Sequence, residues 1–233
     1  MIAGPNASGK TTITGYLRKR NLHLGYYINA DDLEAELAQT GNLYFGRYQI
    51  SVDTSEIISF FTAHPLYQPL STMYVEVDGN ILYAEQPGIT GYFAAILADF
   101  IRQKLLQARV SFTFETVMSS ADKIHLLRTA KEKGYRTYLY YICTDNVQIN
   151  ISRAADRKET GGHNVPEDKI APRYDRSLDL LIDAIKLSDR AYIFDNSGVR
   201  HLFIAEVTGG RTIELKTRKI PGWFTKAVYE KII

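Results

Sequence analysis

The pattern GxxxxGK(S/T) constrains this chain more than any other feature, and it is complete in Gly4-Pro5-Asn6-Ala7-Ser8-Gly9-Lys10-Thr11. In this pattern glycines permit a tight turn, and successive N–H groups point into one concavity at the start of a helix. The pattern is specific when it joins a strand to a helix. Here the apolar residues 1–3 precede it, and a helix is predicted over 10–20. The pattern therefore predicts a phosphate-binding loop, and the alternative is a glycine-rich turn that caps a helix.

Individual residues of this loop have expected roles. We expect Lys10 to reach the β- and γ-phosphates of a nucleotide and the Thr11 hydroxyl to bind Mg²⁺. Thr12, in the next position, is assigned with the loop to nucleotide binding. The predicted cofactors are therefore ATP or GTP together with Mg²⁺.

The remainder of the chain alternates strand-like and helix-like segments, which is typical of a mostly parallel sheet covered on both faces. Strands are predicted at 26–29, 111–117, 137–143 and 190–194, and helices at 31–39, 120–133, 146–158 and 167–188. We expect one α/β P-loop domain over residues 1–233, a length that is ample for a buried core. The lead-in of three residues is short for a central strand, so whether residues precede Met1 is left open.

Two regions depart from this alternation. The first, about 41–91, is rich in Tyr, Pro and Gly, and we interpret it as an insertion that contains a β-hairpin around Asp78-Gly79. Its tyrosines could line a pocket for a sugar or a base, or could serve local packing. The second, about 200–233, is predicted to form a hairpin around Gly209-Gly210 and a short helix.

Composition limits the function classes. The net charge of +2 is too balanced for a nucleic-acid binder, since such proteins concentrate Lys and Arg. No apolar run approaches the roughly 20 residues that span a bilayer, and no leader precedes the first strand, so we expect a cytoplasmic protein without a membrane partner. Cys143 is the only cysteine and is expected to be buried in a strand. His and Cys spacings predict no structural zinc site.

Acidic residues follow two predicted strands. Asp31 and Asp32 come after the second strand, and Glu115 ends the strand at 111–117. Ligands of open α/β sheets bind outside the carboxyl ends of strands, where a carboxylate can accept a hydroxyl proton or hold Mg²⁺ through water. We therefore predict that Asp31 or Asp32 is catalytic. The alternative for all three acids is helix capping.

Arginines around a glycine pair suggest a lid over about 153–173. Arg153 and Arg157 are four residues apart and share one helix face, and Gly161-Gly162 could serve as a hinge. Guanidinium groups stabilise the charge that develops during phosphoryl transfer. Arg153 is the stronger candidate, and the alternative is a solvated basic helix face. His163 alone is weak evidence for any role.

Several segments together resemble the zeta-toxin family of P-loop kinases. They are IAGPNASGKTT (2–12), YINADDLE (27–34), FETVMSS (114–120), AKEKGYRTYLYYI (130–142) and GGHNVPEDKIAPRYDRSLDLL (161–181). The resemblance implies an adenylate-kinase-like fold with a five-stranded parallel sheet. It also implies phosphorylation of a sugar hydroxyl, with UDP-N-acetylglucosamine as the first candidate acceptor.

The resemblance also implies residue roles. Asp31 matches the catalytic base, Arg153 the first lid arginine, and Glu115 and Asp99 acids that contact the acceptor. Asp32 and Thr116, next to two of these acids, are assigned to acceptor binding with them, and His163 occupies the position of the second lid arginine. Residues 116–119 and the 41–91 insertion depart from the family pattern, so the acceptor is expected to differ more than the fold.

Two function classes follow. The first is a kinase for a small-molecule hydroxyl, acting as a toxin if an antitoxin protein is its partner. The second is a nucleotide-gated binding module with weak or no kinase activity, in which the insertion contacts a partner. Transfer of phosphate to a metabolite would distinguish the two.

Overall fold

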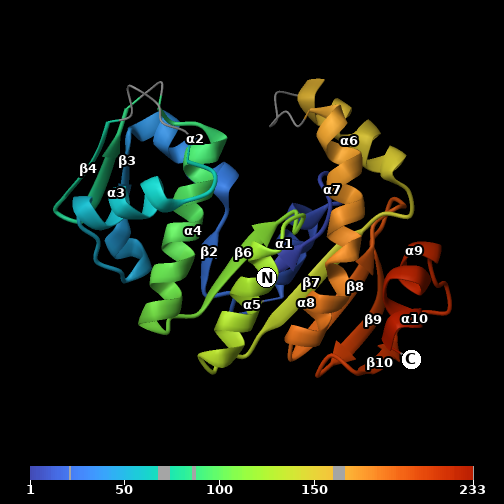
Figure 1. Cartoon of the computed structure of the whole chain (residues 1–233). Helices are drawn as coiled ribbons and strands as arrows, with labels where there is room; N and C mark the ends of the chain where they lie inside the picture. Colours follow the sequence, from blue (N-terminus) through green and yellow to red (C-terminus); the bar gives the residue numbers. More distant parts are fainter. Residues whose placement is uncertain (21, 68–73, 86–87, 160–165, 233) are drawn as a thin grey trace. The chain divides into compact units, whose positions relative to one another are not determined.

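The computed structural model describes residues 1–20, 22–67, 74–85, 88–159 and 166–232 (Figure 1). The chain divides into two compact units. Unit 1 comprises Met1–His23 and Glu115–Ile233, and unit 2 is the continuous segment Leu24–Phe114. No described helix combines the length and the apolar character needed to cross a membrane.

Unit 1 is built on a mostly parallel sheet. Its strands are β1 (Ile2–Ala3), β7 (Tyr138–Cys143), β8 (Arg190–Asp195), β9 (Leu202–Thr208) and β10 (Thr212–Leu215). β1 pairs in parallel with β7 and with the end of β6 (Phe112–Thr116), and β7 pairs in parallel with β8. The hairpin β9–β10 continues the sheet from β8 in the antiparallel sense. The predicted C-terminal hairpin is thereby confirmed.

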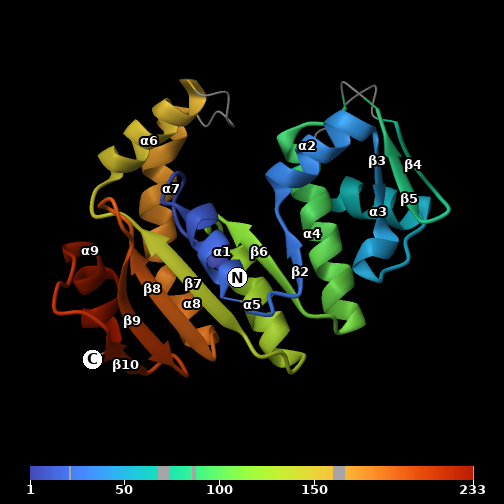
Figure 2. The same ribbon diagram turned by 180° about the vertical axis from the view of Figure 1, so that it is seen from behind.

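Helices cover the sheet of unit 1. They are α1 (Lys10–Lys19), α5 (Asp122–Glu132), α6 (Val147–Glu159), α7 (Glu167–Asp179) and α8 (Leu181–Leu187). The predicted short C-terminal helix is also present, as α9 (Gly222–Phe224), a π-helical turn (Thr225–Tyr229) and α10 (Glu230–Ile232). Figures 1 and 2 show α5 and α8 on one side of the sheet and α1 on the other. The single helix predicted over 167–188 is wrong, because the chain forms two helices that meet at Leu180.

The core of unit 1 lies along β7. Tyr141 is fully buried, and its hydroxyl lies 3.1 Å from the Ser177 hydroxyl on α7. Cys143, at the end of the same strand, is also fully buried, as its apolar surroundings predicted. Burial raises the pKa of its thiol to about 12, so Cys143 remains a neutral thiol at physiological pH.

Unit 2 begins and ends on paired strands. β2 (Tyr26–Ile28) lies parallel to residues 112–114 of β6. Tyr26 N donates to Ser111 O over 3.1 Å, and the Thr113 hydroxyl donates to Leu24 O over 2.6 Å. With β2–β6 included, five strands run parallel in the order β2-β6-β1-β7-β8. The predicted five-stranded parallel sheet is confirmed.

The rest of unit 2 is a helical layer with a small antiparallel sheet. The helices are α2 (Ala30–Thr40), α3 (Thr54–Ala63) and α4 (Gly91–Ala108), and a 3₁₀ turn spans Phe45–Tyr48. The sheet has the order β3 (Asn42–Tyr44), β5 (Ile81–Ala84), β4 (Val75–Asp78). Its β4–β5 pair is the predicted hairpin at Asp78-Gly79, whereas β3 and α3 were not predicted.

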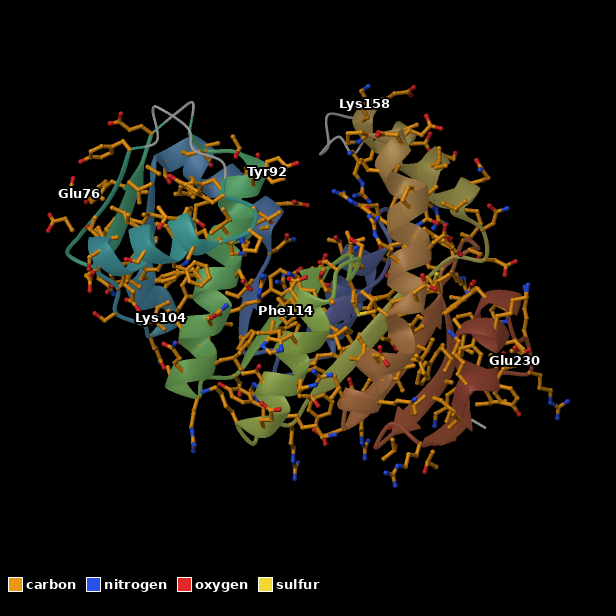
Figure 3. All side chains as sticks on the ribbon, in the orientation of Figure 1. Glu76, Tyr92, Lys104, Phe114, Lys158 and Glu230 are labelled. Atoms are coloured by element: carbon orange, nitrogen blue, oxygen red, sulfur yellow. The ribbon has the colours of Figure 1, made fainter. Side chains whose placement is uncertain are left out.

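Aromatic and ionic contacts hold α3 and the 3₁₀ turn against α4. The ring of Phe45 meets that of Phe100 edge-on with centroids 6.1 Å apart. Lys104, which Figure 3 labels on α4, pairs with Glu56 on α3 over 2.8 Å. The described residues of the 41–91 region, 41–67, 74–85 and 88–91, thus belong to unit 2.

Candidate functional site

The predicted P-loop joins β1 to α1, as its sequence requires. Gly4 has φ 148° and Gly9 has φ 96°, a backbone region that favours glycine. A Cβ at Gly4 would lie 1.9 Å from the Ile142 carbonyl oxygen, and one at Gly9 would lie 2.1 Å from Nδ2 of Asn196. Gly4 is therefore required by close approach to backbone as well as by conformation, and Gly9 is favoured chiefly by its positive φ.

Lys10 lies across the loop. Its ammonium group donates to the Gly4 carbonyl over 3.0 Å and to the Pro5 carbonyl over 2.9 Å. These bonds hold a positive charge beside the amides at the start of α1, where the helix dipole also favours an anion. The arrangement combines a charged donor with a backbone concavity, as a triphosphate tail requires.

Ser8 supplies a further donor in the loop. The residue is fully buried, and among the described residues its hydroxyl has no hydrogen-bond partner. A buried hydroxyl without a partner is costly, and a phosphate oxygen would satisfy it. The residues of this loop therefore fit a bound phosphate group.

Thr11 and Thr12 occupy the first turn of α1, and both are exposed. No cluster of three or more His, Cys, Asp or Glu side chains suited to a metal ion occurs in the described part of the chain. Mg²⁺ at nucleotide sites takes few protein ligands and completes its shell with phosphate oxygens and water. A single threonine hydroxyl beside the loop fits that requirement, and the assignment of Thr11 to Mg²⁺ stays a prediction.

Two asparagines that the sequence did not single out brace the loop. Asn196 Nδ2 donates to the Ser8 carbonyl over 2.8 Å, and Asn150 Nδ2 donates to the Asn6 carbonyl over 2.5 Å. Asn196 directly follows β8, at the same end of the parallel sheet as the loop. The rule that ligands gather at the carboxyl ends of strands was a signal that could have identified Asn196.

Arg153, on α6, contacts the segment that carries Asn196. Its guanidinium donates to the Asn196 carbonyl over 2.7 Å and lies 3.4 Å from the Gly198 carbonyl. In this structure Arg153 therefore holds the segment 196–198, and Asn196 of that segment holds the Ser8 carbonyl of the P-loop. Arg157 lies on the same helix and is exposed. His163 and the Gly161-Gly162 pair lie outside the described residues.

Glu115 and Thr116 end β6 beside β1. The Thr14 hydroxyl of α1 donates to the Glu115 carboxylate over 2.5 Å, and Gly4 N donates to the Thr116 carbonyl over 3.2 Å. Glu115 therefore contacts the first helix of the P-loop and does not cap α5, which begins after Ala121. Both residues lie next to the loop within unit 1.

A buried carboxylate anchors the segment after β8. Asp195 is 8% exposed, and it accepts from the Trp223 indole over 2.8 Å and from the Ser197 amide and hydroxyl over 3.0 and 2.9 Å. The C-terminal turn of the chain is thereby tied to the residues that brace the P-loop.

Replacement of Trp223 by phenylalanine will lower the free energy of unfolding by about 1–3 kcal/mol, because a buried carboxylate loses one of its donors. Chemical denaturation of purified protein measures the change. Tyr229→Phe is the matched control, since Tyr229 is 37% exposed and the change should stay within about 0.5 kcal/mol. Equal stability of Trp223→Phe and the unmodified chain would contradict the anchoring role.

Asp31 and Asp32 lie in unit 2, in the first turn of α2, and both are exposed. The helix is capped by Asn29, whose side chain accepts from the Asp31 amide over 3.0 Å. Because Asn29 fills the capping role, neither aspartate is needed for it. Their carboxylates stand at the amino end of α2, where the helix dipole favours negative charge.

Asp99 lies on α4 of unit 2, within a polar cluster. Its carboxylate pairs with Arg102 over 3.0 Å and lies 3.5 Å from Nε2 of His64, which directly follows α3. The structure thus places Asp99 among structural contacts of α4, and its predicted contact with the acceptor stays a prediction.

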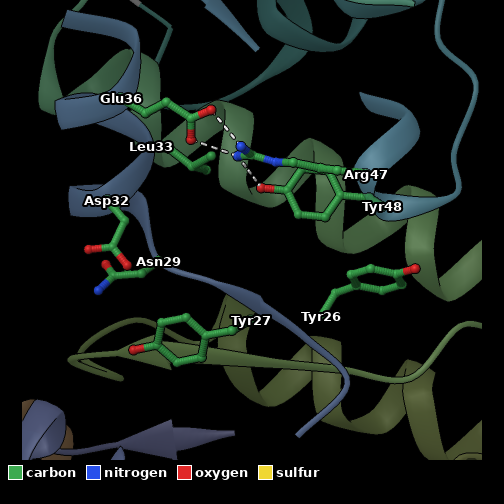
Figure 4. A pocket seen from close by; sticks show the side chains of 8 residues that line it. All are labelled: Tyr26, Tyr27, Asn29, Asp32, Leu33, Glu36, Arg47 and Tyr48. Atoms are coloured by element: carbon green, nitrogen blue, oxygen red, sulfur yellow. Dashed lines mark hydrogen bonds and ion pairs between the residues drawn. The ribbon is translucent and has the colours of Figure 1, made fainter. Parts of the chain in front are cut away.

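A pocket of about 310 Å³ opens beside α2 (Figure 4). Three tyrosines, one leucine and four polar side chains line it: Tyr26, Tyr27, Asn29, Asp32, Leu33, Glu36, Arg47 and Tyr48. All eight belong to unit 2. The pocket therefore brings Asp32 together with residues of β2 and of the 3₁₀ turn.

Arg47 lines this pocket with two hydrogen-bond partners, and its side chain is 38% exposed. Its guanidinium binds both carboxylate oxygens of Glu36, over 2.5 and 2.8 Å, and donates to the Tyr48 hydroxyl over 2.7 Å (Figure 4). Burial lowers the pKa of Arg47, but the bonds to Glu36 and Tyr48 outweigh it and raise that pKa overall. Burial likewise raises the pKa of the Tyr48 phenol. The three groups form a fixed polar wall.

Comparison with known proteins places the chain in a family. The family model described as zeta toxin matches residues 67–207, more than half of the chain. An uncharacterised protein of Haemophilus influenzae is 35% identical over 69 residues, which are 30% of this chain and 49% of that protein.

The chain is also similar to solved structures, and one with a TM-score above 0.5 shares its fold. The crystal structure of AvrRxo1-ORF1:-ORF2 with ATP superimposes with a TM-score of 0.59 at 17% identity, covering 99% of this chain and 62% of the other. A chain of the PezAT chromosomal toxin–antitoxin system of Streptococcus pneumoniae gives a TM-score of 0.47 at 16% identity, covering 86% and 70%. This chain therefore spans about half of the H. influenzae protein and less than two thirds of the AvrRxo1 chain.

Proposed function

Because this chain belongs to the zeta toxin family, we propose that it is a kinase that transfers the γ-phosphate of a nucleoside triphosphate to a hydroxyl group of a small acceptor. The observation that carries the proposal is the P-loop between β1 and α1. There the Lys10 ammonium, the Ser8 hydroxyl that lacks a partner among the described residues, and the amides at the start of α1 belong to one short loop and helix turn. Such a set of donors suits a polyphosphate.

ATP is the favoured donor, and bound ATP with Mg²⁺ would supply the phosphoryl group and neutralise part of its charge. AvrRxo1-ORF1:-ORF2, which shares the fold, was crystallised with ATP. Lys10 holds the β- and γ-phosphates, Thr11 provides the protein ligand to Mg²⁺, and residues 4–9 and 12 contact the phosphates through the loop and the first helical turn. GTP is the alternative donor.

Asp31 acts as the general base. It is an exposed carboxylate that is not needed for capping α2, so it can accept the proton of an acceptor hydroxyl. Asp32 lines the pocket beside it and positions the acceptor. The family resemblance implies the same role for Asp99 and Glu115, and we assign Thr116 and His163 to acceptor binding with them.

Arg153 is the proposed cationic group of the lid, with Arg157 as a second contact to the nucleotide. Its present bonds to carbonyl oxygens of residues 196–198 hold α6 near the segment that braces the P-loop. A guanidinium that exchanges carbonyl partners for phosphate oxygens gains charge-assisted hydrogen bonds. Arg153 therefore stabilises both the loop and the charge that develops on the transferred group.

The acceptor proposed first is a sugar nucleotide, UDP-N-acetylglucosamine, which is the acceptor that the family resemblance implies. An antitoxin protein is the proposed macromolecular partner, on the strength of the family alone. The neutral, buried Cys143 suits a reducing compartment, and we place the protein in the cytoplasm.

Incubation with γ-labelled ATP, Mg²⁺ and a cell-metabolite extract tests the function. We expect one labelled small molecule, and omission of Mg²⁺ with added chelator should abolish the label. ATP uptake without a labelled product in any extract would favour the second candidate, a nucleotide-gated binding module. Absence of both uptake and product would overturn the proposal.

A further inference from the structure

The pocket beside α2 has a charge pattern that limits what it can hold. Asp32 and Glu36 are acidic, and Arg47 is the one cation among its eight lining residues. That cation is already bound through two hydrogen bonds to Glu36. A phosphate or carboxylate group placed here would meet the negative charge of Asp32 and would have to displace Glu36 from Arg47.

The remaining lining groups suit an uncharged ring. Aromatic faces pack against flat or ring-shaped groups, and carboxylate oxygens accept hydrogen bonds from hydroxyl or ring N–H donors. Tyr26, Tyr27 and Tyr48 supply the aromatic surface, and Asp32 supplies acceptor oxygens. The volume of about 310 Å³ lies at the lower end of small-molecule sites, which corresponds to one ring system.

We propose that this pocket binds the uncharged, hydroxyl-bearing ring of the acceptor, a sugar or nucleoside, and that the Glu36–Arg47 pair excludes phosphate groups from it. Any diphosphate carried by the acceptor lies outside the pocket. The proposal deepens the proposed function and rests on it for the role of Asp31. It also gives the region 41–91 a role in acceptor binding, because Arg47 and Tyr48 belong to its 3₁₀ turn.

The 3₁₀ turn is fixed from within unit 2. Phe45, at its start, is fully buried and packs edge-on against Phe100 of α4, and the ring of Tyr48 meets that of Tyr26 with centroids 5.9 Å apart. Gln49, with φ 58°, ends the turn. Arg47 is thus presented to Glu36 by a packed turn, so the pair is a built feature of the pocket.

The pocket and the proposed general base share the first turn of α2. Asp32 lines the pocket, whereas Asp31, which precedes Asp32 in the same helical turn, is not among its lining residues. In the proposed function, the acceptor hydroxyl gives its proton to the Asp31 carboxylate while its oxygen forms a bond to the γ-phosphorus. The bond from that phosphorus to the β–γ bridging oxygen breaks, the nucleoside diphosphate leaves, and Asp31 later releases the proton to water.

Binding measured without ATP tests the inference. The probes are uridine, adenosine and N-acetylglucosamine, each paired with its monophosphate. Measurements use the full chain with Lys10→Ala, so that phosphate binding at the P-loop contributes little. We expect at least one uncharged member to bind more tightly than its phosphate, and Tyr27→Ala to weaken it by roughly tenfold.

Glu36→Gln is the decisive variant, because it removes the carboxylate that occupies Arg47. The ratio of phosphate to uncharged-ring affinity should rise by about tenfold or more. Glu76→Gln is the matched control, since Glu76 is an exposed glutamate of β4 in the same unit and does not line the pocket; it should leave the ratio unchanged.

Three outcomes overturn the inference: tighter binding of the phosphates to the chain with Glu36 intact, no change of the ratio in Glu36→Gln, or binding of none of the six probes at millimolar concentration. Each leaves phosphoryl transfer from ATP to be judged by the metabolite assay. Conversely, failure of that assay leaves ring binding in the pocket intact, so the two failures are distinguishable.

Discussion

Replacement of Asp31 by alanine will lower the rate of phosphoryl transfer by at least about 100-fold, since general-base catalysis contributes roughly 10²–10⁴ in rate. ATP binding will stay near that of the unmodified chain, because Asp31 is assigned to the acceptor hydroxyl and not to the nucleotide. Transfer is measured with γ-labelled ATP and the labelled acceptor from the extract, and binding is measured by calorimetry.

Glu34→Ala is the matched control for Asp31→Ala. Glu34 is a partly exposed acid on the same helix and does not line the pocket, so its loss should leave the rate unchanged. Full turnover by Asp31→Ala would show that another group takes the proton, with Asp32 as the first candidate. Growth arrest on expression that Asp31→Ala relieves would add evidence for a toxin.

Replacement of Lys10 by alanine will impair both binding and transfer. A hydrogen bond from a charged group is worth about 1.5–3 kcal/mol, so the Kd for ATP should rise roughly 10- to 100-fold. The rate should fall further, because the ammonium group also stabilises the charge that develops on the transferred phosphoryl group. Calorimetry with ATP and Mg²⁺ measures the first effect, and the labelled transfer assay measures the second.

Lys19→Ala controls for the loss of a lysine from the same helix. Lys19 is exposed in the last turn of α1, at the opposite end of the helix from the loop, and its loss should change neither quantity. An unchanged Kd in Lys10→Ala would remove the P-loop from the nucleotide site. Together the Lys10 and Asp31 variants separate binding of the donor from activation of the acceptor.

Local sequence signals predicted much of the fold. The P-loop, the apolar strand at Tyr138–Cys143 and the two glycine-containing hairpins depend on residues that are close in sequence, and the structure confirms each of them. β3 was not predicted, because three residues form a strand here only through pairing with β5, about 40 positions away in the chain. The break at Leu180 was also missed, since α7 and α8 have one continuous helical pattern.

Some residues of the candidate site could likewise be identified from local sequence, and others could not. Residues within the P-loop motif could be identified from spacing, as could the acids that follow strands. Asn150 and Asn196 could not be assigned to the loop, because they meet it across 144 and 188 positions of chain. The Glu36–Arg47 pair was hidden for a similar reason: charged residues at that separation are common on surfaces, and only the packed 3₁₀ turn brings these two into one wall.

Unit 2 is one continuous segment of the chain, and its two ends are joined by hydrogen bonds between Leu24 and Thr113 and between Tyr26 and Ser111. A continuous segment whose two ends lie close together can be replaced by the equivalent segment of a related protein without changing the path of the rest of the chain. The Glu36–Arg47 pair belongs to this segment, whereas the P-loop belongs to unit 1. Chimaeras exchanged at these two points are expected to take their acceptor preference from the protein that contributes unit 2.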